Sequence, residues 1–178
     1  RETGGFFFTS HDHEKLTHRP KPGYDNATPS GNGVAAYTLQ RMGHLLGEFR
    51  YLHAAERTLR LFYPALVRHP DSCCSLLLAL EQWLTPPTVV ILRGKANALM
   101  RWENALRQRA PIALVLAPPI DRMESAMLPP SLAKPFPEGA GVNAWVCHGV
   151  KCLPEITDLQ ELLRISEIRG KIRSLFYN

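Results

Sequence analysis

Apolar residues in the first half of the chain recur at the three- to four-residue spacing of amphipathic helices. One stripe follows Ser30 and a second extends to Pro64; together they comprise Ala35, Leu39, Met42, Leu46, Leu52, Ala55, Leu59 and Phe62. Ser30 or Asn32 can cap the first helix, and Gly47 can end it in a left-handed conformation. Pro64 marks a kink or an end of the second helix. The short connection between the stripes predicts an antiparallel helical hairpin.

A third helix is predicted over residues 71–84, with apolar positions at Leu76, Leu77, Leu80 and Leu84. Its end is marked by Pro86 and Pro87, because proline cannot continue a helix. From residue 88 onward the pattern changes from helical spacing to short β-branched runs separated by one amphipathic segment.

These runs, residues 88–92 and 112–116, predict two buried strands. The segment between them, residues 96–109, predicts a helix with Leu99, Trp102 and Leu106 on its apolar face. Strand, helix and strand over about 30 residues form a βαβ unit, whose strands are parallel because the helix carries the chain back.

The last part of the chain adds a strand and a helix to this pattern. Residues 143–147 predict the strand, which follows a proline-rich connection over residues 118–141. Thr157 is placed to cap the final helix, with Gln160 completing a capping box and Gly170 ending the helix. Leu159, Leu162 and Leu163 supply its apolar face.

Composition narrows the class of protein. The 178 residues are 45% hydrophobic and 21% charged, as in folded globular domains. No run approaches the roughly 18 apolar residues of a membrane span, so we expect no membrane partner. The net charge of +5 comes from scattered single cations, whereas nucleic-acid binding requires a clustered basic surface. Four cysteines and no signal peptide predict a cytoplasmic protein that folds without a cofactor.

Several segments resemble one protein family. They are Gly4-Gly5-Phe6-Phe7-Phe8-Thr9, Arg19-Pro20-Lys21, Tyr24-Asp25 and Pro29-Ser30-Gly31-Asn32, followed near the end by Val146-Cys147, Cys152, Pro154 and Asp158. In this order they are similar to the C-terminal portion of the family that includes bacterial YyaL and spermatogenesis-associated protein 20. The resemblance covers essentially the whole chain, and its first cluster is the more specific.

The resemblance implies a fold that the spacing alone does not. Members of the family carry an N-terminal thioredoxin-like domain and a barrel of paired helices like that of six-hairpin glycosidases and sugar epimerases. The expected fold is therefore mixed and helix-rich, with antiparallel helix pairs of a partial (α/α) barrel over residues 1–87. A small parallel α/β element over residues 88–178 follows. The chain begins at Arg1, just before the apolar stretch Gly4-Gly5-Phe6-Phe7-Phe8-Thr9, which predicts a piece of a longer chain. One or two helix pairs cannot close a six-pair barrel, so we expect a homo-oligomer or a longer chain.

The loop before the first helix is the candidate binding site, because such loops line the central cavity of helical barrels. Asp25 is the candidate general acid or base, if burial raises its pKa. Arg19, Lys21, Tyr24 and Asn32 are candidates for holding a sugar-like ligand, Tyr24 by stacking on a sugar ring. The structural alternative is the stronger one: such residues are typical of any long turn, and Asp25 can simply pair with Arg19.

Two further groups of residues invite chemical interpretations. Cys147 and Cys152 are separated by four residues, so they are either two half-buried thiols at a strand end or a redox pair bridging a loop. The segment His11-Asp12-His13-Glu14 suggests a metal, because both imidazoles lie on the same side of an extended chain. Zinc normally requires three or four ligands and no third ligand is evident, so we expect no metal. Cys73 and Cys74 are adjacent near a helix start and are interpreted as packing residues.

Two functional hypotheses follow. The first is part of a barrel enzyme acting on a carbohydrate by acid/base chemistry, carried by the loop from Arg19 to Asn32. The second is a non-catalytic interaction or assembly module of a redox-linked protein. A short helical array leaves apolar faces without neighbours, and we expect these at Leu39, Met42, Leu59 and Phe62. A convergence of Arg19, Tyr24 and Asp25 in a cavity favours the enzyme, and their use in structural bonds favours the module.

Overall fold

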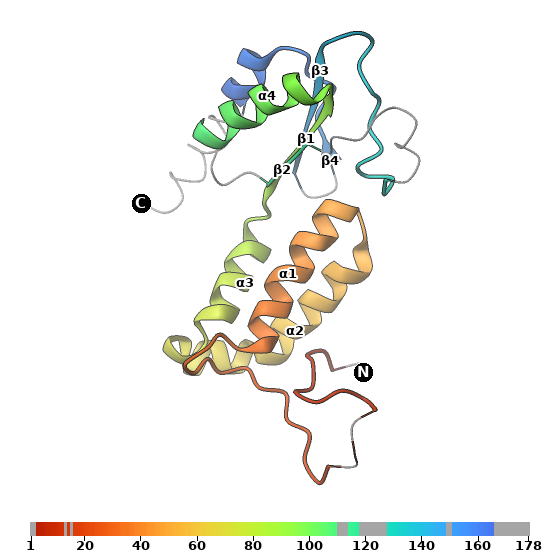
Figure 1. The fold of residues 1–178 in the computed structure, drawn as a ribbon. Coiled ribbons are helices and arrows are strands. Elements are labelled where there is room, and N and C mark those ends of the chain that lie inside the picture. The colour runs from red at the N-terminus through yellow and green to blue at the C-terminus, as the bar shows by residue number, and fades with distance from the viewer. Residues whose placement is uncertain are drawn as a thin grey trace. The chain divides into compact units, whose positions relative to one another are not determined.

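The computed structural model describes residues 3–12, 14, 16–109, 114–117, 128–148 and 151–165. The chain divides into two compact units, Arg1–Pro86 and Pro87–Asn178. The first unit is helical, and the second contains a small sheet (Figure 1). No helix in these described ranges is long and apolar enough to cross a membrane.

The helical unit is built around a hairpin of two helices (Figure 1). Its elements are α1 (Gly31–Leu46), α2 (Phe49–Arg68), the 3-10 turn η1 (Pro70–Ser72) and α3 (Cys74–Leu84). Ser30 caps α1, because its Oγ accepts a hydrogen bond from the Gly33 amide at 3.1 Å. Gly47 ends α1 with a φ of 69°, the left-handed conformation that glycine adopts at little cost. Both ends of α1 are therefore as predicted.

The buried face of α1 differs from the predicted stripe. Its buried residues are Asn32, Gly33, Ala36, Gln40 and Gly43, whereas the predicted Ala35, Leu39, Met42 and Leu46 are half-buried or exposed. Close helix packing explains the difference, because small residues let two backbones approach. A Cβ added at Gly33 would lie 2.7 Å from the Ser75 Cβ, and one at Gly43 would lie 2.6 Å from the Leu52 Cδ2. Helical spacing of apolar residues cannot detect a face built from glycine and alanine.

The other two helices follow the prediction more closely. On α2, Ala55 and Leu59 are buried as expected, and the helix continues past Pro64 to Arg68. On α3, the helix begins at Cys74 instead of residue 71, because η1 takes the preceding residues. Leu76 is buried, but Leu77 and Leu84 are exposed.

The second unit is a four-stranded sheet in the order β2-β1-β3-β4. Its strands are β1 (Thr88–Gly94), β2 (Leu114–Leu116), β3 (Val142–His148) and β4 (Lys151–Cys152). β2 pairs parallel to β1, and α4 (Ala96–Arg109) connects them as predicted. β3 pairs antiparallel to β1 over seven residues, so the predicted parallel element is in fact a mixed sheet. Antiparallel pairing needs no crossover helix, and it gives β1 a full ladder on its second edge.

The core of this unit lies between one sheet face and two helices. Val90, Val146 and Leu92 from the sheet pack with Leu99, Trp102 and Leu106 from α4 and with Leu162 and Leu163. The last two belong to a helical segment over residues 159–165. Asp158 caps this segment, because its Oδ1 accepts from the Glu161 amide at 2.8 Å. The predicted Thr157 cap is therefore wrong by one residue, and Gly170 lies outside the described residues.

Candidate functional site

Asp25 joins the beginnings of two helices. Its Oδ1 accepts a hydrogen bond from the Ser30 amide at 2.7 Å, and its Oδ2 accepts one from the Ser75 amide at the same distance. The Ser75 hydroxyl also donates to Oδ1. Ser30 precedes α1 and Ser75 lies in the first turn of α3, where free amides and the helix dipole favour a carboxylate. Asp25 thus ties the loop to both helices, and its predicted pairing with Arg19 gives way to these bonds.

The bonding of Asp25 sets its protonation. Partial burial alone would raise the pKa of the Asp25 carboxyl, but the hydrogen bonds from Ser75 and Ser30 outweigh burial and hold that pKa below its ordinary value. A general acid at neutral pH requires the opposite shift. The Asp25 carboxyl is therefore ionised and serves as a hydrogen-bond acceptor. Acid/base chemistry on a carbohydrate at this residue stays a prediction.

Asn32 holds the first residues of the chain against α1. Its side chain is 2% exposed. The Oδ1 atom accepts from the Phe6 amide at 2.6 Å, and the Nδ2 group donates to the carbonyls of Phe6 at 3.0 Å and Pro22 at 2.8 Å. One amide side chain thereby satisfies three backbone groups of two separate segments. Phe6 lies in irregular backbone directly after Gly4 and Gly5, which both have positive φ.

Arg19 and Lys21 also stabilise the N-terminal segment, residues 4–10. The Arg19 guanidinium donates to the carbonyls of Thr9 and Ser10 at 2.9 and 3.1 Å. The Lys21 ammonium donates to the Gly4 carbonyl at 2.6 Å. Both cations lie over the Phe7 ring, 4.5 and 4.7 Å from its centroid, where the ring's electron-rich face attracts them. Both side chains are therefore engaged in holding the chain's own backbone.

Tyr24 is the candidate with the most accessible side chain. It is 54% exposed, and its ring meets the edge of His69 with centroids 6.1 Å apart. A ring in this position is free to stack on a ligand, but Arg19 and Asp25 have their polar atoms turned to the backbone and to Ser75. The five predicted site residues thus lie in and next to one loop, but their polar atoms bind different partners and do not face a shared ligand position.

The residues that complete this network were absent from the sequence prediction. Thr58 on α2 is fully buried, and its Oγ1 accepts from the Gly5 amide at 3.3 Å while donating to the Ala54 carbonyl. Ser75 connects Asp25 with the Ser30 hydroxyl at 3.0 Å. Thr58 and Ser75 lie on the inner faces of α2 and α3. A polar residue within an apolar stripe is the sequence feature that could have identified them.

Replacing Asp25 with asparagine is expected to destabilise the helical unit by about 1–2 kcal/mol, because an amide keeps only part of the charge-assisted capping. Since the folded-state pKa of Asp25 is lowered, its contribution to stability is present above the unfolded-state pKa and is lost as the pH falls through the folded-state pKa. Urea unfolding of wild type and Asp25→Asn should therefore converge at acid pH. Asp71→Asn, an exposed aspartate in the adjacent turn, is the control and should change stability little. Unchanged stability of Asp25→Asn at neutral pH would contradict the structural role.

A shallow pocket lies elsewhere on the helical unit, between α2 and α3. It has a volume of about 140 Å³ and is lined by Glu56, Leu59, Arg60, Tyr63, Leu80 and Trp83. None of the predicted site residues lines it. Within the described ranges, no group of three or more histidine, cysteine, aspartate or glutamate side chains is placed to hold a metal ion; His13 lies outside these ranges.

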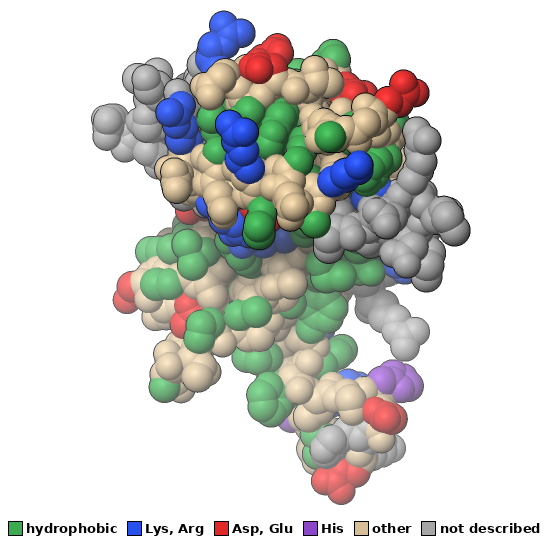
Figure 2. Space-filling model, turned by 45° about the horizontal axis from the view of Figure 1, so that its top comes forward, with side chains coloured by type: hydrophobic (Ala, Val, Ile, Leu, Met, Phe, Trp, Pro, Cys, Tyr) green, Lys and Arg blue, Asp and Glu red, His purple; other side chains and the backbone are tan. Residues whose placement is uncertain are grey.

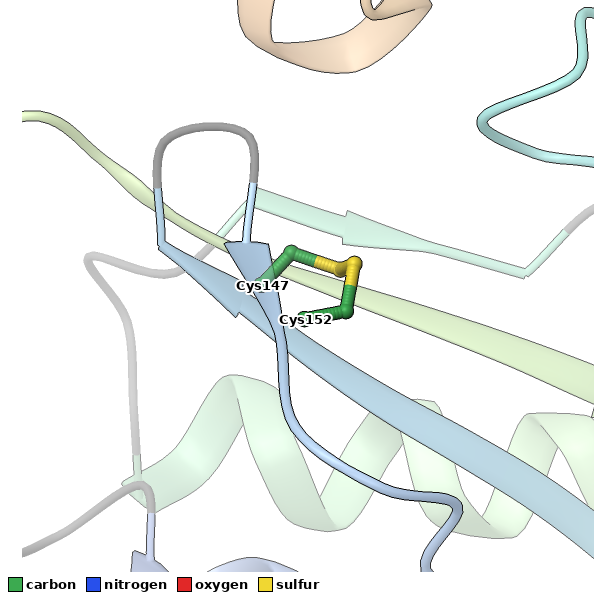
Figure 3. Close-up of a disulfide and its surroundings, with 2 residues drawn as sticks. All are labelled: Cys147 and Cys152. Carbon is green, nitrogen blue, oxygen red and sulfur yellow. A yellow bond between two sulfur atoms is a disulfide. The ribbon is translucent and has the colours of Figure 1, made fainter.

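Cys147 and Cys152 are joined in a disulfide that closes the β3–β4 hairpin (Figure 3). They are directly opposed in the antiparallel register, with Cα atoms 3.9 Å apart. The structure thus has the bridged pair in place of two free thiols. Cys73 and Cys74 are not bonded to each other: both are free, Cys73 buried and Cys74 exposed.

Arg93 is a buried charge that the strand pattern concealed. It is fully buried on β1, and its guanidinium lies 5.7 Å from the centroid of the Phe136 ring. Burial lowers the pKa of Arg93. The residue follows Leu92, where the predicted strand ends, and β1 in fact continues through Arg93 to Gly94.

No protein-family model matches the chain, and no curated protein or solved structure matches it significantly. The resemblance to the family of YyaL and spermatogenesis-associated protein 20 therefore rests on the quoted sequence segments and stays a prediction. Over the described residues the structure is mixed, with helices and a four-stranded sheet. These elements do not establish a partial (α/α) barrel, which stays a prediction.

Proposed function

We propose that this chain is a non-catalytic assembly module, in which the outer face of α3 packs against α2 of a second copy. The observation that supports the proposal is the exposure of leucines on α3. Leu77, Leu78 and Leu84 have exposed fractions of 36%, 57% and 72%. Exposed apolar side chains gathered on one element are typical of an interaction surface.

The composition of α3 supports the same proposal. Its eleven residues, CSLLLALEQWL, include one charged residue, Glu81. A helix that is apolar on all sides is normally covered on all sides. Within the helical unit, α3 buries Ser75, Leu76, Ala79 and Gln82, which form one face. The opposite face carries Leu77, Glu81 and Leu84, and the exposed Leu78 lies at the border of that face. A second helix is needed to cover these leucines.

The surface of α2 is suited to that role. Phe49, Tyr63 and Val67 are 57%, 57% and 64% exposed, and Arg57 and Arg60 are exposed beside them. Arg60 is paired with Glu56 within α2, so the part of this surface that suits the leucines of α3 is its apolar side chains. Figure 2 shows hydrophobic side chains gathered on the helical unit. Because two different surfaces meet, the contact is head-to-tail and repeats from copy to copy, as a ring or an open array.

The bonding of the polar loop is consistent with a module. The side chains of Arg19, Asp25 and Asn32 bind the backbone of Phe6, Thr9, Ser10, Pro22, Ser30 and Ser75. They therefore tie the loop to the beginnings of α1 and α3. This is the use that the assembly hypothesis predicts for them.

The test is the molar mass of the full chain in solution by light scattering. We expect wild type to exceed the 20.0-kDa chain mass in a concentration-dependent way, and Leu78→Glu to return to that mass, because a buried charge disrupts an apolar contact. Met100→Glu, at a 60% exposed position on α4, is the matched control and should associate as wild type does. Circular dichroism checks that all variants are folded. A monomeric wild type at every concentration would overturn the proposal.

A further inference from the structure

We propose that the Cys147–Cys152 disulfide is a redox-exchange site, which a dithiol reduces by attacking the sulfur of Cys152. This inference concerns the second unit and is independent of the assembly proposed for the helical unit. It is carried by the place of the disulfide in the sheet and by the unequal exposure of its two residues.

The disulfide adds little to the topology of the sheet. It joins residues five apart in the sequence, which the β3–β4 register already places opposite each other. A bond that closes so short a loop removes less entropy from the unfolded chain than one that closes a long loop. β3 is independently fixed by its seven-residue ladder with β1. The fold of the unit therefore persists without the bond, as a reversible site requires.

The two cysteines differ in their access to solvent. Cys147 is 5% exposed on the central part of the sheet, whereas Cys152 is exposed on the edge strand β4. Val146 points into the core beside α4, so Cys147, the next residue, points to the opposite face of the sheet. Figure 3 shows the bond spanning the hairpin. An attacking thiolate thus meets Cys152 first, and Cys147 is the leaving group.

His148 and Lys151 directly follow and precede the two cysteines and form the next pair of the hairpin. Both are exposed. Because side chains alternate along a strand, those of His148 and Lys151 lie on the other face of the sheet from the disulfide. Access to the bond is therefore set by the position of Cys152 on the edge strand.

The exchange balances with one dithiol as the reductant. A thiolate of the dithiol attacks Cys152, forming a mixed disulfide as the Cys147–Cys152 bond breaks and Cys147 leaves as a thiolate. The second thiolate of the dithiol then attacks the dithiol's other sulfur, which is bonded to Cys152, and releases Cys152 as a thiolate. Two electrons pass to the protein, the dithiol becomes a disulfide, and its two protons end on Cys147 and Cys152.

Reduction has a local structural consequence. Between β3 and the residues after β4, the Leu153 amide donates to the Val146 carbonyl and the Ile156 amide donates to the Ala144 carbonyl, both at 2.9 Å. The first bond is next to the disulfide, and the second lies further along, where Ala144 and Ile156 form a bridge. Opening the disulfide frees the end of the hairpin but leaves this bridge in place.

The test uses the folded full chain with dithiothreitol and, separately, with reduced thioredoxin as a protein dithiol. Differential alkylation and peptide mass spectrometry report each cysteine. We expect both reagents to reduce Cys147 and Cys152 without denaturant. The rates per thiol with dithiothreitol and with thioredoxin then show whether a small or a protein dithiol is the better reductant. Hydrogen exchange at the Leu153 amide should then rise about tenfold or more, with Ile156 unchanged. Reduction only after unfolding in urea, with either reagent, would overturn the proposal.

Two variants, each lacking one cysteine of the pair, test which sulfur is attacked. With glutathione disulfide, Cys147→Ser should form a mixed disulfide at Cys152 about tenfold faster than Cys152→Ser forms one at Cys147, because only Cys152 is accessible. Cys74 is an exposed thiol in the same molecule and serves as the internal reference for access alone. Equal rates at Cys147 and Cys152 would contradict the assigned direction of attack.

Discussion

Replacing Asn32 with aspartate is expected to destabilise the helical unit by about 3 kcal/mol or more. The substitution preserves size but removes both donors of the Nδ2 group, which bind the Phe6 and Pro22 carbonyls. It also places a carboxylate against those two carbonyl oxygens at a position that is 2% exposed. Two lost hydrogen bonds and an unpaired buried charge act in the same direction.

Urea unfolding followed by circular dichroism measures this effect. Asn26→Asp is the matched control, because Asn26 is exposed and its Oδ1 only accepts a bond, from the Ala27 amide. An aspartate keeps that acceptor, so the control should change stability by less than about 0.5 kcal/mol. Limited proteolysis should also cut residues 3–9 faster in Asn32→Asp. If both variants have wild-type stability, Asn32 does not hold the N-terminal segment.

Gly33→Ala is expected to cost about 2 kcal/mol, despite the better helix propensity of alanine. The added Cβ would lie 2.7 Å from the Ser75 Cβ and 2.9 Å from the Ser75 backbone carbon, so α1 and α3 must separate. Separation also disturbs Ser75, which donates to Asp25. The effect therefore combines overpacking with a weakened cap.

Gly31→Ala is the control for Gly33→Ala, since it lies two residues away in the same helix. Nothing lies within 4 Å of a Cβ added at Gly31, so alanine there should be neutral or slightly stabilising. The pair is compared in the same urea titrations. Equal stability of the two variants would mean that α1 and α3 are not in close contact at Ser75.

Local sequence signals were sufficient to predict the elements that bury apolar side chains. α4 has the predicted bounds and apolar face, and the Gly47 end of α1 and the β1–β2 pairing are also as predicted. In each case a short-range rule, such as periodicity or the conformational freedom of glycine, decides the structure. Tertiary contacts leave these elements unchanged.

The remaining features depend on contacts between distant segments. Gln40 is fully buried because its Nε2 donates to the Ala79 carbonyl across two helices at 2.8 Å. Likewise, Asp25 caps α3 from 50 residues away. The antiparallel β3 and the small-residue face of α1 have the same origin. The sequence identified the polar loop as special, but whether its residues bind a ligand or the backbone depends on such partners.

The most direct measurement of the proposed assembly is photocrosslinking from α3. A photoreactive amino acid replaces Leu78 in the full chain, and Met100 in the control, and the adducts are mapped by mass spectrometry. The account predicts that the label at Leu78 crosslinks to α2 of a second copy, between Phe49 and Val67, and that the label at Met100 does not. No intermolecular adduct from Leu78, or adducts spread equally over the chain, would contradict an interface on α3.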